Sequence, residues 1–250
     1  MEIARYNVLG VQLSALNMEL ARQAIREAIA QRRKGYVCVT GVHGVMECQE
    51  DAGLREIHNR AFLCTPDGMP MVWLGRRRGH AHVQRVYGPD LMLALLAEPG
   101  LRHFFYGGTE GVTARLREKM TARFPGVQIV GEYEPPFRPL TEAELAGLAG
   151  QVAAARPDIM WIGLSTPKQE RFMAAHLERL ETTLMIGVGA AFDFHAGRVP
   201  QAPRWMQRAG LEWFYRMCRE PRRLGPRYLK NNPRFLWLLL VEALGGRRRG

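Results

Sequence analysis

Residues 159–188 read IMWIGLSTPKQERFMAAHLERLETTLMIGV, and this stretch decides the fold. Residues 159–163 and 183–188 form two short, mostly apolar runs, and residues 168–180 between them favour a helix. A strand that is apolar on both faces is typical of a parallel sheet covered by helices on both sides. The stretch therefore predicts the strand–helix–strand unit of an α/β protein.

The same alternation extends through most of the chain. Four further strands are predicted at residues 36–40, 61–65, 103–106 and 127–131. Five further helices are predicted at residues 19–33, 45–59, 89–97, 111–123 and 142–155. Thr141 and Glu144 have the spacing of a capping box, and Thr109 is placed to cap the helix that follows it. Over residues 1–197 the pattern predicts a Rossmann-like three-layer sandwich with a mostly parallel sheet of about six strands.

The last fifty residues have a different composition. They hold 12 of the 35 Lys and Arg residues but only three of the 24 acidic residues, so they carry +9 of the formal net charge of +11. Seven aromatic residues lie among these charges, and five prolines divide residues 198–250 into short helical pieces such as 211–219 and 234–244. We interpret residues 198–250 as a basic, helical appendage. Its composition is typical of contact with an anionic membrane or with nucleic acid.

Other features limit where the protein works. The N-terminus MEIARYNVLG has no basic segment followed by an apolar one, so we expect no signal peptide. The longest apolar run, residues 235–241, is far shorter than the ~20 residues that span a bilayer. The four cysteines form no CxxC pair, which predicts free thiols in a reducing cytoplasm and no metal site.

Residues with useful chemistry follow several predicted strands, and ligands of open parallel sheets bind beyond the carboxyl ends of the strands. Asp67 follows the second strand and stands between Pro66 and Gly68. A carboxylate there can act as a general base, or it can simply cap the next helix. The sequence alone leaves both readings of Asp67 open.

Glycines follow two other strands. Gly107 and Gly108 precede a predicted helix, where free backbone N–H groups favour a phosphate, although a tight turn explains them equally. Gly187 and Gly189 allow a backbone to approach a ligand closely, or allow a strand and helix to pack closely. Both pairs are therefore candidate binding positions.

Four polar side chains complete the candidates near the strand ends. Gln169 opens a helix and can hydrogen-bond a sugar or a uracil edge. Arg85 can bind a phosphate or lie in solvent as a loop charge. His43 and His195 each follow a strand, but no metal-ligand spacing joins them.

Seven segments, in order from Val8 to Leu236, resemble the WecG/TagA/CpsF family of glycosyltransferases. They are VLGVQLSALNMELA, TPDGMP, RVYGPDL, YGGTEGV, IGLSTPKQE, GVGAAFDFHAGRVPQAPRWMQRAGLEWFYR and EPRRLGPRYLKNNPRFL. The resemblance implies inverting, metal-independent transfer of an N-acetylated hexosamine of the N-acetylmannosamine type, without a cofactor. The donor would be a UDP-sugar and the acceptor a polyprenyl-diphosphate-linked sugar.

The resemblance also implies a setting. Such enzymes build cell-surface polysaccharides, teichoic-acid linkage units or enterobacterial common antigen. The enzyme would be cytoplasmic and peripheral on the inner face of the cell membrane, with residues 198–250 docking on the anionic surface and completing the active site.

By the same resemblance, Asp67 matches the family's candidate general base. Thr40, Arg85 and Gln169 match its polar active-site positions and would bind substrate. From the appendage we select Arg216, Arg223 and Arg227 for contact with the diphosphate. One position departs from the family, which often has Asn two residues after the Thr. Val42 stands there in this chain, so that contact is lost or His43 beside it supplies it.

Two other functions compete with this interpretation. A nucleotide-dependent oxidoreductase on a Rossmann sheet would carry GxGxxG and an acidic residue about 20 positions later, and this pattern is missing from the sequence. A basic nucleic-acid-binding module would fit the tail, but no recognised motif supports it, and we expect no nucleic-acid partner. The donor sugar and the oligomeric state, a homo-oligomer included, stay open.

Overall fold

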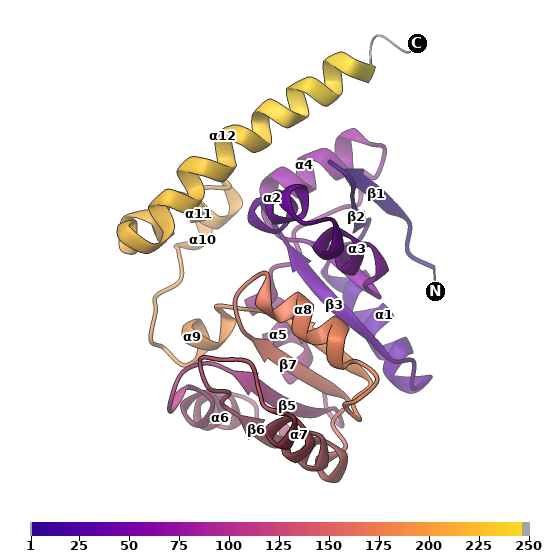
Figure 1. The fold of residues 1–250 in the computed structure, drawn as a ribbon, viewed down its shortest axis with the longest axis vertical. Coiled ribbons are helices and arrows are strands. Elements are labelled where there is room, and N and C mark those ends of the chain that lie inside the picture. The colour runs from indigo at the N-terminus through magenta and orange to yellow at the C-terminus, as the bar shows by residue number, and fades with distance from the viewer. Residues whose placement is uncertain (1, 247–250) are drawn as a thin grey trace.

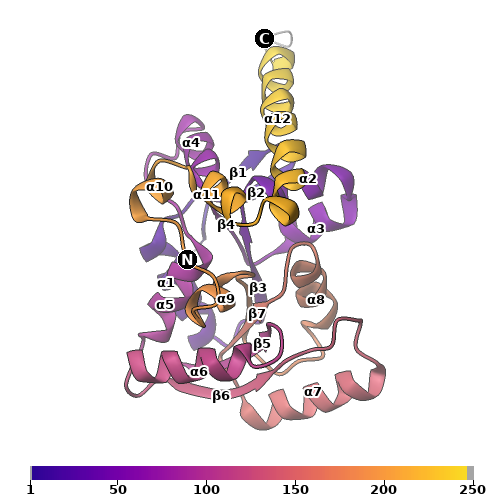
Figure 2. The same cartoon turned by 90° about the vertical axis from the view of Figure 1, so that its left-hand side faces the viewer.

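The computed structural model describes residues 2–246, so Arg247, Arg248 and Arg249 of the basic tail lie outside the described residues (Figures 1 and 2). At its centre is a parallel sheet of six strands in the order β4-β3-β8-β7-β5-β6. The strands are β3 (Gly35–Thr40), β4 (Leu63–Pro66), β5 (Arg102–Gly107), β6 (Gln128–Tyr133), β7 (Ile159–Gly163) and β8 (Leu184–Gly187). All six predicted strands and the predicted α/β class are confirmed.

Helices cover both faces of this sheet (Figure 1). On one face lie α2 (Val42–Glu50), α3 (Ala52–Arg60), α7 (Glu142–Ala155) and α8 (Lys168–His176). On the other lie α1 (Met18–Ala30), α5 (Gly88–Leu96), α6 (Val112–Arg123) and α9 (Ala191–His195). The remaining helices are α4 (Met69–Arg77), α10 (Arg204–Arg208), α11 (Glu212–Arg219) and α12 (Pro221–Gly246).

Side chains of each strand alternate between the two cores. In β7, Met160 and Ile162 pack with the helices of the first face, whereas Ile159 and Trp161 pack with those of the second. All four side chains are fully buried. Burial of such a side chain contributes roughly 1.5–3 kcal/mol relative to exposure. This alternation explains why the strands are apolar at consecutive positions.

A small antiparallel sheet was not predicted from the sequence. Strands β1 (Arg5–Val8) and β2 (Val11–Ser14) form a hairpin through Leu9 and Gly10, which both have positive φ angles, of 50° and 88°. The hairpin lies beside β4, where the Ser14 hydroxyl accepts a hydrogen bond from a strand N–H. It thereby covers one edge of the large sheet.

Two predictions about helix starts and breaks are wrong. The predicted helix at residues 45–59 is divided into α2 and α3 at Asp51, whose side chain caps α3 by accepting from Leu54 N–H at 2.9 Å. Thr109 does not cap α6, because the N-cap residue is Gly111 and the Thr109 hydroxyl accepts from Arg198 instead.

The predicted capping box at α7 is confirmed. The Thr141 hydroxyl accepts from Glu144 N–H at 3.3 Å, and the Glu144 carboxylate accepts from Thr141 N–H at 2.8 Å.

The end of the chain differs from its prediction. Instead of a separate helical piece at residues 234–244, one helix of 26 residues, α12, continues through Pro226 and Pro233 (Figure 1). A proline removes one backbone hydrogen bond, but contacts on both sides can hold the helix together. Leu224 and Phe235 are both buried and supply such contacts. Within residues 2–246, none of the helices, α12 included, is both long and apolar enough to cross a membrane.

Candidate active site

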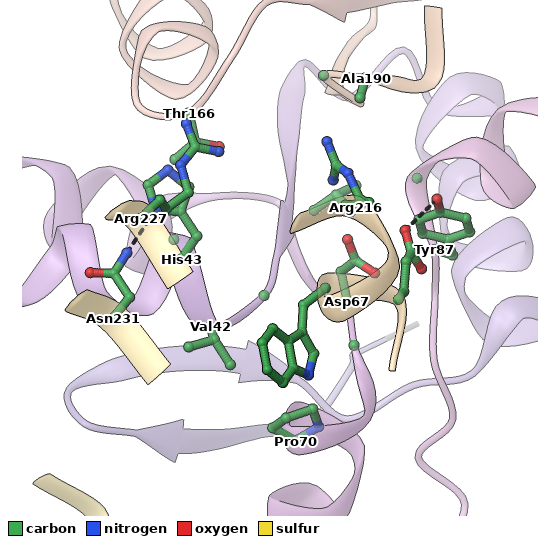
Figure 3. Close-up of a pocket in the computed structure, with 18 of the residues that line it drawn as sticks. Val42, His43, Asp67, Pro70, Tyr87, Thr166, Ala190, Arg216, Arg227 and Asn231 are labelled. Atoms are coloured by element: carbon green, nitrogen blue, oxygen red, sulfur yellow. Dashed lines mark hydrogen bonds between the residues drawn. The ribbon is translucent and has the colours of Figure 1, made fainter. Parts of the chain in front are cut away.

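A cavity of about 650 Å³ lies at the carboxyl edge of the sheet, between the sandwich and the C-terminal helices (Figure 3). Its floor includes Gly41 after β3, Asp67 after β4 and Gly187 at the end of β8. Its roof includes Arg216 of α11 and Arg227 of α12. The structure therefore brings the ends of several strands and the appendage together around one space.

Four side chains form a connected network at one end of this cavity. Arg85 Nε donates to Asp67 Oδ1 at 3.1 Å, and Arg85 Nη2 donates to Glu212 Oε2 at 2.5 Å. The Tyr87 hydroxyl donates to Glu212 Oε1 at 2.7 Å. The Arg85 guanidinium lies over the Tyr87 ring, 3.9 Å from its centroid. One cation thus bridges a carboxylate of the sandwich and a carboxylate of the appendage.

Asp67 is held in surroundings that favour its protonated form. Burial raises the pKa of Asp67, and the Glu212 carboxylate adds to this, while the guanidiniums of Arg85 and Arg216 oppose it. The net pKa shift is upward. The reading that Asp67 only caps the next helix is wrong, because α4 begins at an N-cap glycine, Gly68, without any side-chain cap. Asp67 instead faces the cavity.

Three guanidiniums from the appendage line the same cavity. Arg223 is paired with Glu220 at 2.5 Å. Arg216 lies 5.6 Å from the centroid of the Phe194 ring, and within residues 2–246 neither it nor Arg227 forms an ion pair with a carboxylate. Burial lowers the pKa of Arg227, and the two neighbouring guanidiniums lower it further. Within residues 2–246 only one of the three, Arg223, forms a close ion pair, so this cluster of like charges is a candidate site for an anion.

His43 lies at the basic end, near Arg227, Asn231 and Thr166 (Figure 3). Its Nδ1 is 3.1 Å from the Asn231 side-chain amide. Burial lowers the pKa of His43 to about 4, with a further contribution from the guanidiniums and opposition from the Thr166 backbone. His43 is therefore neutral near pH 7 and offers a hydrogen bond rather than a charge. Val42 lies beside it in the lining.

Gln169 and Gly187 also line the cavity and pack against each other. Gln169 Oε1 accepts from Gly189 N–H at 3.1 Å, and its Nε2 donates to Glu170 Oε1 at 2.9 Å. A Cβ at position 187 would lie 3.0 Å from the Gln169 amide, so glycine leaves room for this side chain. The amide is held in place on both sides.

Four candidate positions do not line this cavity: Thr40, Gly107, Gly108 and His195. Thr40 is buried below the floor, where its hydroxyl accepts from the Cys64 thiol at 3.2 Å. Gly107 and Gly108 lie at the end of β5, and a Cβ at Gly107 would stand 2.6 Å from the Gly163 backbone. Close packing of β5 against β7 therefore accounts for Gly107.

The N-terminus of α6, after these glycines, already holds an anion of the protein itself. The Glu134 carboxylate accepts from Gly111 N–H at 2.9 Å and from Thr113 N–H at 2.8 Å. The Thr113 hydroxyl donates to it as well, at 2.8 Å. The donors that a phosphate would use are thus occupied by Glu134.

Comparison with known proteins identifies the family of the chain. The family model described as Glycosyl transferase WecG/TagA/CpsF family matches residues 6–249. The chain belongs to this family. The resemblance is thereby confirmed, the protein is a glycosyltransferase, and neither the oxidoreductase nor the nucleic-acid-binding alternative is supported.

Two curated relatives of this glycosyltransferase carry the name N-acetylglucosaminyldiphosphoundecaprenol N-acetyl-beta-D-mannosaminyltransferase. The protein of Bacillus subtilis strain 168 is 32% identical over 175 residues, which cover 69% of this chain and 66% of the relative. The protein of Bacillus spizizenii strain W23 is 29% identical over 196 residues, which cover 77% of this chain and 74% of the relative.

Sequence reasoning missed two members of this candidate site, Glu212 and Tyr87. A signal for each existed: Glu212 is one of only three acidic residues in the last fifty, and Tyr87 follows two positions after Arg85. Their meeting, across 125 positions of sequence, depends on how the appendage folds back.

The remaining candidates have structural contacts. His195 is buried in α9, with Nε2 at 3.0 Å from the Pro89 carbonyl oxygen. The predicted free thiols are confirmed, with Cys38, Cys48 and Cys64 buried and Cys218 exposed. Within residues 2–246, no three His, Cys, Asp or Glu side chains are grouped so as to hold a metal ion.

Proposed function

We propose that this glycosyltransferase moves an N-acetylated hexosamine of the N-acetylmannosamine type from a UDP-sugar to a polyprenyl-diphosphate-linked sugar. The names of the two Bacillus relatives support this class of sugar and this class of acceptor. The reaction would serve the synthesis of a cell-surface polysaccharide, for example at the linkage unit of a teichoic acid.

One observation carries the proposal: a single cavity contains a carboxylate with a raised pKa and three guanidiniums, two of which form no close ion pair with a carboxylate in the described residues. In the proposed mechanism, Asp67 removes the proton of the acceptor hydroxyl as that oxygen attacks the anomeric carbon. The bond to the diphosphate breaks on the opposite face, which inverts the configuration. Arg216, Arg223 and Arg227 stabilise the negative charge of the departing UDP, so the mechanism includes no metal ion.

The other cavity residues would hold the substrates in place. A neutral His43 and the fixed backbone around Gln169 and Gly187 can hydrogen-bond the sugar or the nucleotide. Thr40 would act indirectly, from below the floor.

The appendage, residues 198–250, would also bring the enzyme to the inner face of the cell membrane. Large apolar side chains are exposed on α10, α11 and α12; they include Trp205, Phe214, Leu229, Leu236, Trp237 and Leu244. Basic side chains of the same helices accompany them. In Figure 2 the C-terminal part of α12 projects beyond the sandwich. Aromatic and basic groups together favour the surface of an anionic bilayer, where a lipid-linked acceptor resides.

The test is UDP release in the presence of anionic vesicles that contain polyprenyl-diphosphate-linked N-acetylglucosamine. A panel of UDP-sugars would be compared with and without the acceptor and with and without EDTA. We expect acceptor-dependent release from one donor that EDTA does not affect. Absence of acceptor-dependent release from every donor would overturn the proposed reaction, whereas inhibition by EDTA would overturn only its metal independence.

A further inference from the structure

Glu212 is the first residue of α11, and its carboxylate reaches from the appendage into the network around Asp67. Its side chain is only 13% exposed. One carboxylate oxygen accepts from Arg85 and the other from Tyr87. Because both oxygens accept hydrogen bonds, Glu212 is not placed to remove a proton from an acceptor. The proposed mechanism of transfer assigns it no role.

Arg85 is shared unequally between two carboxylates. Its contact with Glu212 is 2.5 Å long, and its contact with Asp67 is 3.1 Å long. The Tyr87 ring under the guanidinium fixes the plane of the fork. A guanidinium carries a single positive charge in a rigid donor geometry, so a closer pairing with one carboxylate leaves the other less neutralised.

We propose that Glu212 is a positioning residue for glycosyl transfer: it holds Arg85 and offsets its charge, which makes Asp67 a stronger base. The proposal rests on the proposed function in taking Asp67 as the base. It assigns to the appendage an electrostatic task on the base that is separate from binding diphosphate.

The groups that face Asp67 determine the direction of the effect. Arg85 comes from the segment before α5, and Glu212 and Arg216 come from α11. Tyr87 precedes α5 and Tyr228 belongs to α12; burial raises the pKa of both hydroxyls, so they are neutral near pH 7. Among these groups Glu212 is the one negative charge. Without it, Asp67 faces two guanidiniums and becomes a weaker base.

The test compares three variants in the UDP-release assay over a range of pH. Glu212→Gln keeps the shape and removes the charge, so we expect the acid limb of kcat/KM to move to lower pH by about half a unit or more. The plateau kcat should fall about tenfold, because a weaker base transfers the proton less effectively. Glu212→Asp should return the limb toward its original position.

Tyr87→Phe is the matched control, because it removes a hydrogen bond to Glu212 and leaves the charge in place. The acid limb of kcat/KM for Tyr87→Phe should lie at the same pH as in the unaltered enzyme. If Glu212→Gln lowers kcat and leaves the acid limb in place, Glu212 has only a structural role and the proposal fails.

A second measurement needs no turnover. NMR titration of the Asp67 carboxyl carbon, in the full chain labelled at aspartate, reports the pKa directly in the unaltered protein and in Glu212→Gln. We expect Asp67 to titrate at lower pH in the variant, and identical titration would overturn the inference. If the titration shifts but no UDP-sugar is consumed, the proposed function fails and the electrostatic link stands.

Discussion

Two regions of the carboxyl edge of the sheet, one after β5 and one after β3, β4 and β8, both carry candidate ligand-binding residues in the sequence. The structure shows that they differ. At β5, two glycines lead into α6 in the manner of a phosphate site, yet the carboxylate of Glu134 occupies the helix N-terminus. At β3, β4 and β8, the strand ends are roofed by guanidiniums of which Arg216 and Arg227 have no ion-pair partner in the described residues. A ligand site is found where polar groups lack internal partners, and a favourable motif alone does not provide one.

The largest effect should come from Asp67. Asp67→Asn removes the base and keeps the shape, so we expect kcat to fall about 10³-fold while UDP affinity, measured by calorimetry, is nearly unchanged. Glu118→Gln, on the exposed surface of α6, is the control and should leave both quantities as they are. Turnover by Asp67→Asn at the unaltered rate would remove Asp67 from the mechanism.

The arginines of the roof should come next. Arg216→Gln and Arg227→Gln each remove a charge that has no close ion-pair partner in the described residues, and we expect kcat/KM to fall about 10²-fold in each. The matched control is Arg117→Gln at the other end of the edge, where Arg117 is paired with Glu132 at 2.8 Å. Steady-state UDP release measures all three. An equal loss of kcat/KM in Arg117→Gln would mean that the roofed cavity and the region around α6 do not differ in their importance for transfer.

The pH dependence should reflect the raised pKa of Asp67. The base form is lost as pH falls through the folded-state pKa, so activity should decline at a higher pH than for an ordinary aspartate.

The free energy of unfolding should depend on pH in the opposite direction. A carboxyl whose pKa is raised by folding favours the folded state below its unfolded pKa, and this contribution is lost as pH rises through the folded pKa.

Asp67→Asn should therefore raise the melting temperature near pH 7 and leave it nearly unchanged in acid, below the ordinary aspartate pKa of 3.8. Thermal unfolding at both pH values tests this. An equal change in melting temperature at the two pH values would contradict the raised pKa.

The smallest effect is expected after β5, where Glu134 is bound to the N-terminus of α6. Glu134→Gln weakens the cap of α6, and we expect a loss of about 1 kcal/mol in the free energy of unfolding without any change in UDP release. The backbone and hydroxyl donors around Glu134 outweigh burial and lower its pKa. Its contribution is thus present above the unfolded pKa and is lost as pH falls. A fall in UDP affinity would show that this end also binds the nucleotide.

Much of the fold could be predicted because it depends on local patterns. Buried parallel strands are apolar at every position, as in β7, and a capping box such as that of Thr141 has a fixed spacing. The hairpin at Leu9 and Gly10 was missed because its strands are only four residues each. The length of α12 was missed because its prolines signal a break, while buried contacts from distant residues hold the helix together.

The site was predicted in part, for a related reason. Asp67 and Gln169 lie shortly after strand ends, and the edge of a parallel sheet brings such residues together, whereas Arg85 reaches the same place from the loop between α4 and α5. Glu212 meets Arg85 across 127 positions of sequence, and no spacing rule indicates that contact. Likewise, the sequence around Gly107 does not indicate that the Glu134 carboxylate binds the N-terminus of α6, the helix that follows.

The structure of the full chain with UDP bound would test the difference between the two ends most directly. We predict that the diphosphate lies within hydrogen-bonding distance of Arg216, Arg223 or Arg227, with Glu134 still bound to Gly111 and Thr113. A diphosphate at the N-terminus of α6, with Glu134 displaced, would contradict the assignment of the roofed cavity as the site of transfer.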